Sequence, residues 1–245
     1  MKILINDREK FVRDFLTPLS KLNESVVLQV GPETIHSLSS SSDGTLILYA
    51  VYDQSNSITD TPETLNIPDI NKLVKVLSCI NETDIEMDLD DNSINYKSSD
   101  MGFKFHLLED GIITAPSISI DKINKLQYDS KFTLQYANVI SLLKGSTFTT
   151  ETDKIYFYTQ ENSVYGKLTD LDRHNVDVFT QKISDEFEGT PLQTALPLNF
   201  ETMRIICSLR FKNLKVSVNT DMKVFLFDVI NEGVKLNFIS SAYIS

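Results

Sequence analysis

The chain has 245 residues, of which 41% are hydrophobic and 23% charged, as in an ordinary globular protein of one large or two smaller domains. Its 34 acidic residues outnumber its 23 basic ones, and a formal charge of −11 argues against a surface that coats nucleic acid everywhere. No stretch approaches 18 consecutive apolar residues, which excludes a membrane-spanning helix, and the apolar stretch in the N-terminal MKILINDREK is too short for a signal peptide. We therefore expect a cytosolic protein that does not bind membranes, with a local basic surface still allowed.

The first half of the chain predicts two helices among several strands. The first helix should begin at Asn6 or Asp7 and be ended near Thr17 by Pro18. The second should cover residues 70–80, introduced by Pro68 and Asp69. Strands are expected at residues 25–30, 45–52, 84–90, 93–97 and 102–108.

The second half repeats this order after an extended connector that carries Gly111 and Pro116. We expect a strand leading into a helix over 131–145, a hairpin over 154–170 and another proline-introduced helix within 196–211. Further strands are expected at 175–183, 214–219, 222–230 and 233–239. Corresponding helices lie about 125 to 130 residues apart, which indicates a two-fold internal repeat. The predicted fold class is α+β, with tandem domains at 1–112 and 123–245, a connector at 113–122, and antiparallel sheets backed by two short helices in each domain.

One predicted strand carries an acidic face. Carboxylates alternate there with Ile85, Met87 and Leu89, and the acidic set is Glu82, Asp84, Glu86, Asp88 and Asp90. Because side chains alternate across a strand, this face should be solvated and strongly negative. Asp88, Asp90 and Asn92 resemble the start of a calcium-binding loop, but serine stands at 93 and 99, where that loop needs glycine and glutamate, so we expect no metal site.

The sequence contains no recognisable catalytic or cofactor-binding motif. It has no glycine-rich phosphate loop, no Cys/His cluster with zinc spacing and no nucleophile elbow. His36, His106 and His174 occur in unrelated contexts, and no nucleophile is placed beside the Asp172–His174 pair. Cys79 and Cys207 lie in apolar, helix-like stretches and should be reduced core residues. We therefore expect a protein that is not an enzyme and needs no cofactor.

The basic residues gather on the predicted helices. In INKLVKVLSCI, Lys72 and Lys75 lie about 60° apart and opposite an apolar face formed by Ile70, Leu73, Leu77 and Ile80. Lys10 and Arg13 repeat the same spacing in the first helix, whereas Lys144 and Arg204 in the second half are less ordered. Exposed helix faces are commonly rich in lysine, because lysine is a good helix former. Because the basic pair recurs on two helices of an otherwise acidic chain, we nevertheless favour a basic surface built from helices.

These residues, with LNIPDINKLVKVLSCINETDIEMDLDDNSI, the connector GIITAP and the order of elements, resemble a DNA sliding clamp, specifically the two-domain processivity clamp of T-even-like bacteriophages. The chain departs from the phage pattern around Pro18–Leu22 and Asp121–Tyr128. The resemblance implies the DNA clamp fold and a homotrimeric ring around double-stranded DNA that tethers the replicative DNA polymerase. A clamp loader ATPase opens such rings, and in this phage group the clamp also assists late transcription.

By the same resemblance, the DNA-facing residues are Lys10, Arg13, Lys72, Lys75, Lys144 and Arg204. A pocket for partner peptides is implied at Ile112, Ile113, Ile118, Tyr243 and Ile244, although these residues could equally pack on their own domains. Edge strands join clamp subunits, and the sequence does not identify which ones. Two alternatives stay open: a β-rich viral binding or structural protein that does not encircle DNA, and a monomeric clamp-like processivity factor.

Overall fold

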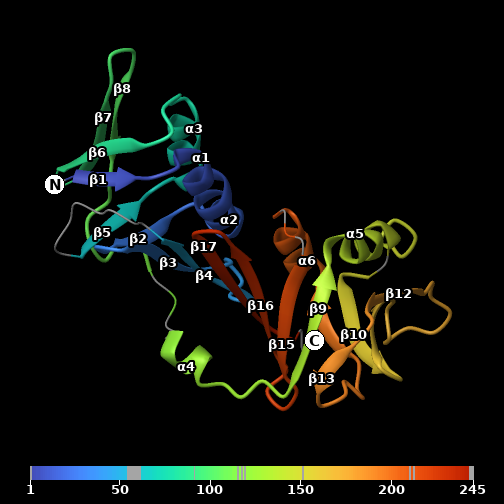
Figure 1. Cartoon of the computed structure of the whole chain (residues 1–245). Coiled ribbons are helices and arrows are strands. Elements are labelled where there is room, and N and C mark those ends of the chain that lie inside the picture. Colours follow the sequence, from blue (N-terminus) through green and yellow to red (C-terminus); the bar gives the residue numbers. More distant parts are fainter. Residues whose placement is uncertain are drawn as a thin grey trace. The chain divides into compact units, whose positions relative to one another are not determined.

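The computed structural model describes residues 2–53, 62–90, 92–114, 116, 118, 120–150, 152–209, 211 and 213–242. Its contacts divide the chain into two compact units (Figure 1). The first unit comprises Met1–Ser117 together with Ile230–Leu236, and the second comprises Ile118–Val229 together with Asn237–Ser245. The sequence-based domain limits, at residues 112 and 123, stay a prediction.

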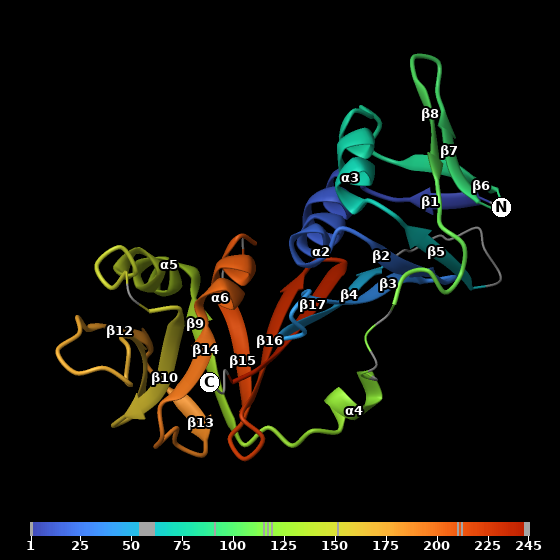
Figure 2. The same ribbon diagram turned by 180° about the vertical axis from the view of Figure 1, so that it is seen from behind.

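The first unit contains two antiparallel sheets and two helical segments. Its elements are β1 (Lys2–Ile5), α1 (Arg8–Lys10), η1 (Phe11–Leu16), α2 (Thr17–Leu22), β2 (Val26–Val30), β3 (Thr34–Ser40), β4 (Leu46–Asp53), β5 (Glu63–Ile67), α3 (Ile70–Ser78), β6 (Ile85–Asp90), β7 (Ser93–Lys97) and β8 (Gly102–His106). One sheet has the order β1-β6-β7-β8, and in the other the strands run β4-β3-β2-β5. The β7–β8 hairpin projects beyond the rest of this unit (Figure 2).

A hairpin from late in the chain completes the first unit. It is formed by β16 (Val224–Asn231) and β17 (Val234–Ser241), and its end, Ile230–Leu236, belongs to the first unit. There β17 lies next to β4 in the sheet, and the Gly233 carbonyl accepts a hydrogen bond of 2.8 Å from the Asp53 amide. One edge of β4 is therefore covered by this hairpin.

The first helix does not end at Pro18, as the sequence predicted, but continues to Leu22. Its middle part, η1, is a π-helix, in which the Thr17 amide donates to the Val12 carbonyl five residues earlier. The shifted bonding places Pro18 in the first turn of a new helical segment, where its missing N–H is not needed. The prediction failed because it assumed an uninterrupted α-helix.

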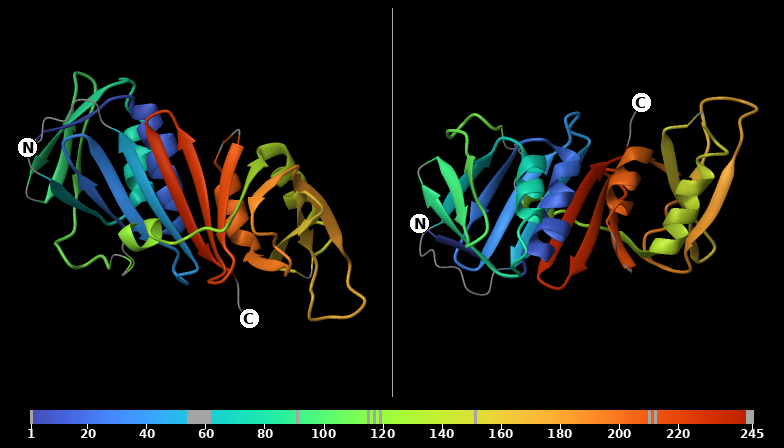
Figure 3. Two further views of the ribbon diagram at one scale, coloured as in Figure 1. Left: turned by 60° about the horizontal axis from the view of Figure 1, so that its bottom comes forward. Right: turned by 90° about the horizontal axis from the view of Figure 1, so that it is seen from above.

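Aromatic rings and leucines hold the helices to the sheets of the first unit. Phe11 stacks on Phe15 with ring centroids 5.3 Å apart, and Tyr52 of β4 meets Phe11 edge-on at 5.0 Å. α3 packs against η1 and α2, so the two helical segments lie side by side (Figure 3). Full burial of an aromatic ring stabilises a fold by about 1.5–3 kcal/mol, so this cluster fixes the first helix on the sheet.

The second unit has the same kinds of element. They are α4 (Ile120–Asn124), β9 (Ser130–Gln135), α5 (Tyr136–Gly145), β10 (Lys154–Gln160), β11 (Ser163–Leu168), β12 (Phe179–Ser184), β13 (Phe187–Gly189), β14 (Leu196–Asn199), α6 (Phe200–Cys207) and β15 (Asn213–Asn219), followed by β16 and β17. One sheet has the order β12-β11-β10-β14, and the other strands run β13-β9-β15-β16-β17.

The two units repeat one topology. β1-β6-β7-β8 of the first corresponds to β9-β15-β16-β17 of the second, and β4-β3-β2-β5 corresponds to β12-β11-β10-β14. In each unit one helix follows the first of these strands, and a second helix follows β5 or its counterpart β14. The predicted repeat and the α+β class, with antiparallel sheets and short helices, are confirmed.

Several details differ from the prediction. The strands β1, β3, β5 and β13 were not expected, nor was β14, whose residues were expected to begin the helix within 196–211. α4 occupies part of the connector that was expected to be extended. β6 begins at Ile85, so Glu82 and Asp84 precede the strand, although all five carboxylates of the acidic set are exposed.

Cys207 is buried, which raises the pKa of its thiol to about 12, but Cys79 is exposed at the end of α3 and is not a core residue. No helix among the described residues is long and apolar enough to cross a membrane.

Candidate nucleic-acid interface

α3 has one buried and one basic face, as predicted. Ile70, Leu73 and Leu77 are buried, whereas Lys72 and Lys75 are exposed on the other side. The helix begins because Asp69 caps it: the Lys72 amide donates a 2.9 Å hydrogen bond to the Asp69 carboxylate. The Lys72 Nζ also lies 3.2 Å from Asp69 Oδ2.

The two lysines of α3 differ in how far their charge is balanced. The Lys72 side chain is 75% exposed, so its pairing with Asp69 is weak and its ammonium can reach a ligand. Among the residues that the structure describes, Lys75 has no ion-pair partner. The exposed side of α3 therefore carries a positive charge that neighbouring carboxylates do not neutralise.

The cap of α3 gives a stability prediction. The hydrogen bond from the Lys72 amide lowers the pKa of the Asp69 carboxyl below its ordinary value. A carboxyl with a lowered folded-state pKa stabilises the fold above the unfolded-state value, about 4, and this stabilisation is lost as the pH falls through the folded-state value. We expect Asp69→Ala to lower the Tm at pH 7, and the difference from the native chain to shrink below about pH 4. Asp69→Asn, which caps without a charge, is the control; equal Tm values for the native chain and the alanine variant at pH 7 would contradict this prediction.

The basic residues of the first helix are more restrained. Lys10 is only 27% exposed and lies 3.6 Å from Asp7 Oδ2. Arg13 is exposed, but it makes two hydrogen bonds to Asp14, at 2.7 and 2.8 Å, and one of 3.2 Å to Glu9. The bonds to Asp14 raise the pKa of Arg13, so it stays charged, but the two carboxylates offset much of that charge.

Lys21 is a candidate that the sequence analysis missed. It is exposed in α2, and no ion-pair partner for it occurs within the described part of the chain. It was overlooked because the helix was expected to end before it. The available signal was Leu19 and Leu22, which continue the apolar face set up by Phe11 and Phe15.

The basic residues of the second unit are sparser. Lys144 is exposed on α5, and no ion pair involves it among the described residues. Arg204 of α6 lies 3.5 Å from Glu201 and over the ring of Phe200, 4.7 Å from its centroid. α5 and α6 pack on each other. The basic side chains of this unit therefore do not form the paired arrangement seen on α3.

The connector residues predicted to bind partner peptides have mixed environments. Ile112 is 59% exposed and Ile118 is also exposed, whereas Ile113 is half-buried. Tyr243 and Ile244 lie outside the described residues. The peptide pocket therefore stays a prediction, carried by two exposed isoleucines.

Solved structures supply the comparison that decides the fold. The chain matches PCNA from A. fulgidus bound to the C-terminal region of FEN-1, with a TM-score of 0.78, 12% identity, and coverage of 100% of this chain and 98% of that chain. It matches PCNA from Thermococcus kodakaraensis with a TM-score of 0.78, 14% identity and coverage of 99% of each chain. A DNA polymerase III beta subunit from Eubacterium rectale matches with a TM-score of 0.77 and 11% identity over 100% of this chain and 66% of that one.

The chain has the DNA sliding-clamp fold. No protein-family model and no curated protein matches its sequence. The predicted class of two tandem clamp-type domains is confirmed by the near-complete coverage of the PCNA structures, while the phage branch of the resemblance rests on the sequence alone.

Within this clamp fold, the repeat exposes two strand edges. The hairpin ending at Ile230–Leu236 covers β4, but β12, the counterpart of β4, has no strand on its outer edge among the described residues. β8, the counterpart of β17, is likewise the end of its sheet in the described chain. Phe103 and Phe105 of β8 are only half-buried, whereas most of the apolar residues of β17 are buried. Uncovered edges of this kind favour pairing with another chain.

An apolar patch accompanies the uncovered edge of β12. Phe148 is 58% exposed, and together with Phe179 of β12 it borders a shallow hollow that also touches Gly145 and Lys144 of α5. Gly145 lies directly under the Phe179 ring, where even a Cβ atom would come within 2.3 Å of a ring carbon. Exposed apolar side chains that adjoin one another can mark a surface that binds another protein.

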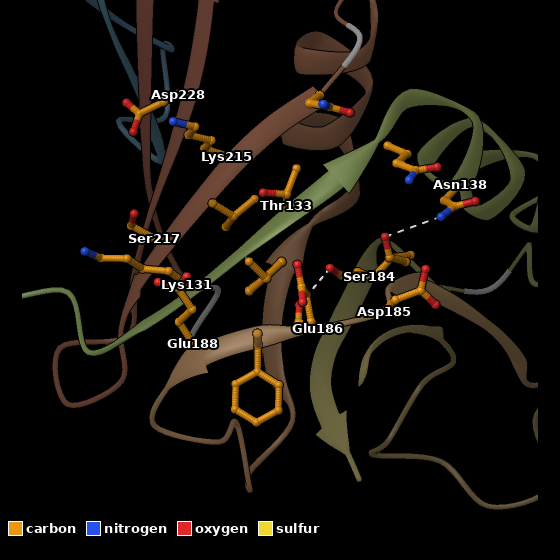
Figure 4. Close-up of a pocket in the computed structure, with 16 residues that line it drawn as sticks. Lys131, Thr133, Asn138, Ser184, Asp185, Glu186, Glu188, Lys215, Ser217 and Asp228 are labelled. Carbon is orange, nitrogen blue, oxygen red and sulfur yellow. Dashed lines mark hydrogen bonds between the residues drawn. The ribbon is translucent and has the colours of Figure 1, made fainter. Parts of the chain in front are cut away.

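A polar trough lies near the other end of β12 in the second unit (Figure 4). It has a volume of about 720 Å³ and is lined by Lys131 of β9, by Glu188 on the neighbouring strand β13, by Lys215 of β15, and by Asp185 and Glu186 on the opposite wall. No group of three or more His, Cys, Asp or Glu side chains in the described chain is placed to hold a metal. The mixed charge of the trough suits contact with protein better than contact with phosphate.

Proposed function

We propose that this chain is a sliding clamp, which closes as a homotrimeric ring around duplex DNA and tethers a replicative DNA polymerase. The observation that carries the proposal is the exposed Lys72 and Lys75 face of α3, set opposite a buried face in an acidic chain with the clamp fold. Lysines on a helix surface contact phosphates without reading bases, so binding is independent of sequence. Acidic strands such as β6 repel stray nucleic acid.

The uncovered strand edges support the ring. In the first unit β17 covers β4, and by the internal repeat β8 of one copy would cover β12 of the next. The two edges are different surfaces, so every copy offers one of each. Such a head-to-tail contact closes into a ring when the rotation per subunit is right, and the patch at Phe148 and Phe179 gives the contact an apolar centre.

The proposed mechanism requires no catalytic group and no cofactor in this chain. Retention on DNA is topological, so weak phosphate contacts let the ring slide while it stays attached. Opening the ring would fall to a clamp loader ATPase. In the branch that the sequence resembles, the clamp also assists phage late transcription, and we extend the proposal to that role. Because one matched PCNA carries the C-terminal region of FEN-1, we also propose that Ile112, Ile113 and Ile118, with Tyr243 and Ile244, receive partner peptides.

The decisive test compares retention on two DNA forms. After loading, the native chain should stay on nicked circular DNA and be lost from linear DNA, because a ring can leave only over an end. Solution mass is measured in parallel and should be about three times 27.8 kDa. Equal loss from both DNA forms would contradict topological tethering. Retention by a particle of 27.8 kDa would instead indicate the monomeric processivity factor.

A further inference from the structure

The π-helical turn η1 in the middle of the first helix remains unexplained by the clamp fold alone. Six residues, Phe11–Leu16, form it. The Thr17 amide donates to the Val12 carbonyl, and the Thr17 hydroxyl donates to the same carbonyl at 2.8 Å. π-turns within α-helices are rare and often occur at functional sites. This one lies in the helix that carries Lys10, Arg13 and Lys21.

The π-turn changes which side chains share a line along the helix. On a regular α-helix, residues four apart drift by about 40°, so Arg13 and Lys21 would point about 80° apart. Bonding of the i to i+5 type winds about 4.4 residues per turn, which reduces that difference to about 25°. A column with a spacing of four residues is thereby kept straight through the middle of the helix.

Burial along the helix follows this spacing. On the packed side, Phe11, Phe15 and Leu19 recur every fourth residue and are all buried. On the opposite side, the same spacing gives a column that is exposed at three positions and half-buried at one. Its members are Glu9, Arg13, Thr17 and Lys21.

We propose that the π-turn aligns Lys21 with Arg13, so that the first helix presents two phosphate contacts about 12 Å apart along one line. This inference rests on the proposed function and adds a binding residue to it. Lys21 is the stronger of the two contacts, because Asp14 and Glu9 already hold Arg13, whereas no carboxylate in the described residues pairs with Lys21. Pro18 is compatible with the π-helical segment, because it lies in the first turn of α2, where a backbone N–H is not needed for a helical hydrogen bond.

The test compares a variant that removes the Lys21 charge with a variant that moves this charge by one residue. Lys21→Ser removes the ammonium, and the double variant Ser20→Lys/Lys21→Ser turns it about 100° around the helix. Lys215→Ser, on an exposed strand position of the second unit, is the control for removal of one charge. Binding of a fluorescent linear duplex is followed by anisotropy between about 50 and 200 mM salt, where the logarithmic slope falls by about 0.9 for each phosphate that the protein no longer neutralises.

Equal reductions of the slope in the single and double variants, with an unchanged slope in the Lys215 control, are the expected result. A native slope in the double variant would show that only net charge matters and would overturn the alignment. A native slope in Lys21→Ser would overturn the phosphate contact itself. Should the native chain show no salt-dependent duplex binding, the proposed function would fall and the inference with it. Thermal unfolding of each variant confirms that the helix is intact.

Discussion

Replacing Phe148 by glutamate is expected to convert a ring of about three times 27.8 kDa into free subunits. The side chain is 58% exposed and borders the hollow beside Phe179 at the uncovered β12 strand. If β8 of a neighbouring copy pairs with β12, this hollow becomes buried. A glutamate there would bring a carboxylate into a contact that excludes water, and even beside Lys144 its desolvation would destabilise the interface by several kcal/mol.

The measurement is solution mass by light scattering over a dilution series. Met222→Glu is the matched control, because Met222 is 61% exposed but lies in the β15–β16 turn, whose strands belong to a different sheet from β8 and from β12. The control should keep the mass of the native ring. Thermal unfolding separates a broken ring from an unfolded subunit, since Phe148 is exposed within its own chain and contributes little to its core.

A trimer that survives Phe148→Glu at low micromolar concentration would contradict the pairing of β8 with β12. A second variant addresses the strand edge directly. Lys104→Pro on β8 removes an N–H that is directed away from β7, because the hydrogen bonds between β7 and β8 are made at the alternate residues Phe103 and Phe105. Proline at this position blocks the addition of a further strand. Loss of the ring in both variants would assign the contact to these two edges; loss in neither would move it elsewhere.

The sequence predicted the helices of the clamp fold better than its strands. α3 was predicted because one short segment holds an N-cap, an apolar stripe and a basic stripe that agree with each other. β3 was missed because its sequence, TIHSLSS, lacks apolar alternation. Its buried positions include Ser37 and Ser39, and the Ser37 hydroxyl is satisfied by a 2.8 Å hydrogen bond to the Val27 carbonyl. A strand that buries serines is stabilised by its neighbours, which a single sequence does not show.

Pro18 shows a different limit. Proline predicts the end of an α-helix because its ring clashes with the preceding turn and its nitrogen carries no hydrogen. A π-turn removes both objections, but nothing in the local sequence announces it. The chain departs from the phage pattern at this place, around Pro18–Leu22, and also around Asp121–Tyr128, where α4 replaces the expected extended connector.

The candidate interface was predictable one helix at a time. Periodicity established that Lys72 and Lys75 share a face, and the structure confirms this. The strength of each charge depended on partners that periodicity does not reveal: Asp14 and Glu9 restrain Arg13, and Glu201 lies beside Arg204. Lys21 could be recognised only after the helix was seen to pass through Pro18.

Reversing the charge of both lysines on α3, in the variant Lys72→Glu/Lys75→Glu, should weaken binding to linear duplex by at least about tenfold at physiological salt. Two attractive contacts with phosphate become repulsive in every copy of the chain. The salt dependence should also become shallower, because fewer counterions are released when the protein binds. The amount of this variant loaded on nicked circular DNA should fall by a similar factor.

The matched control is Lys215→Glu/Lys223→Glu, which changes the net charge equally at exposed positions on β15 and in the turn after it. It should keep native binding if position matters more than total charge. The mass of both variants should stay that of the ring, and their Tm should move by no more than a few degrees. This follows because Lys72 and Lys75 are exposed and the pairing of Lys72 with Asp69 is a surface contact.

The comparison of the two variants separates the clamp from its main rival. A β-rich binding or structural protein that never encircles DNA would show equal and small effects for both pairs, because only its overall acidity would change. A clamp should respond to α3 and not to β15, since its DNA contacts depend on the exposed faces of the helices. Unchanged duplex binding and unchanged loading in Lys72→Glu/Lys75→Glu would therefore remove α3 from the interface, and with it the observation on which the proposed function rests.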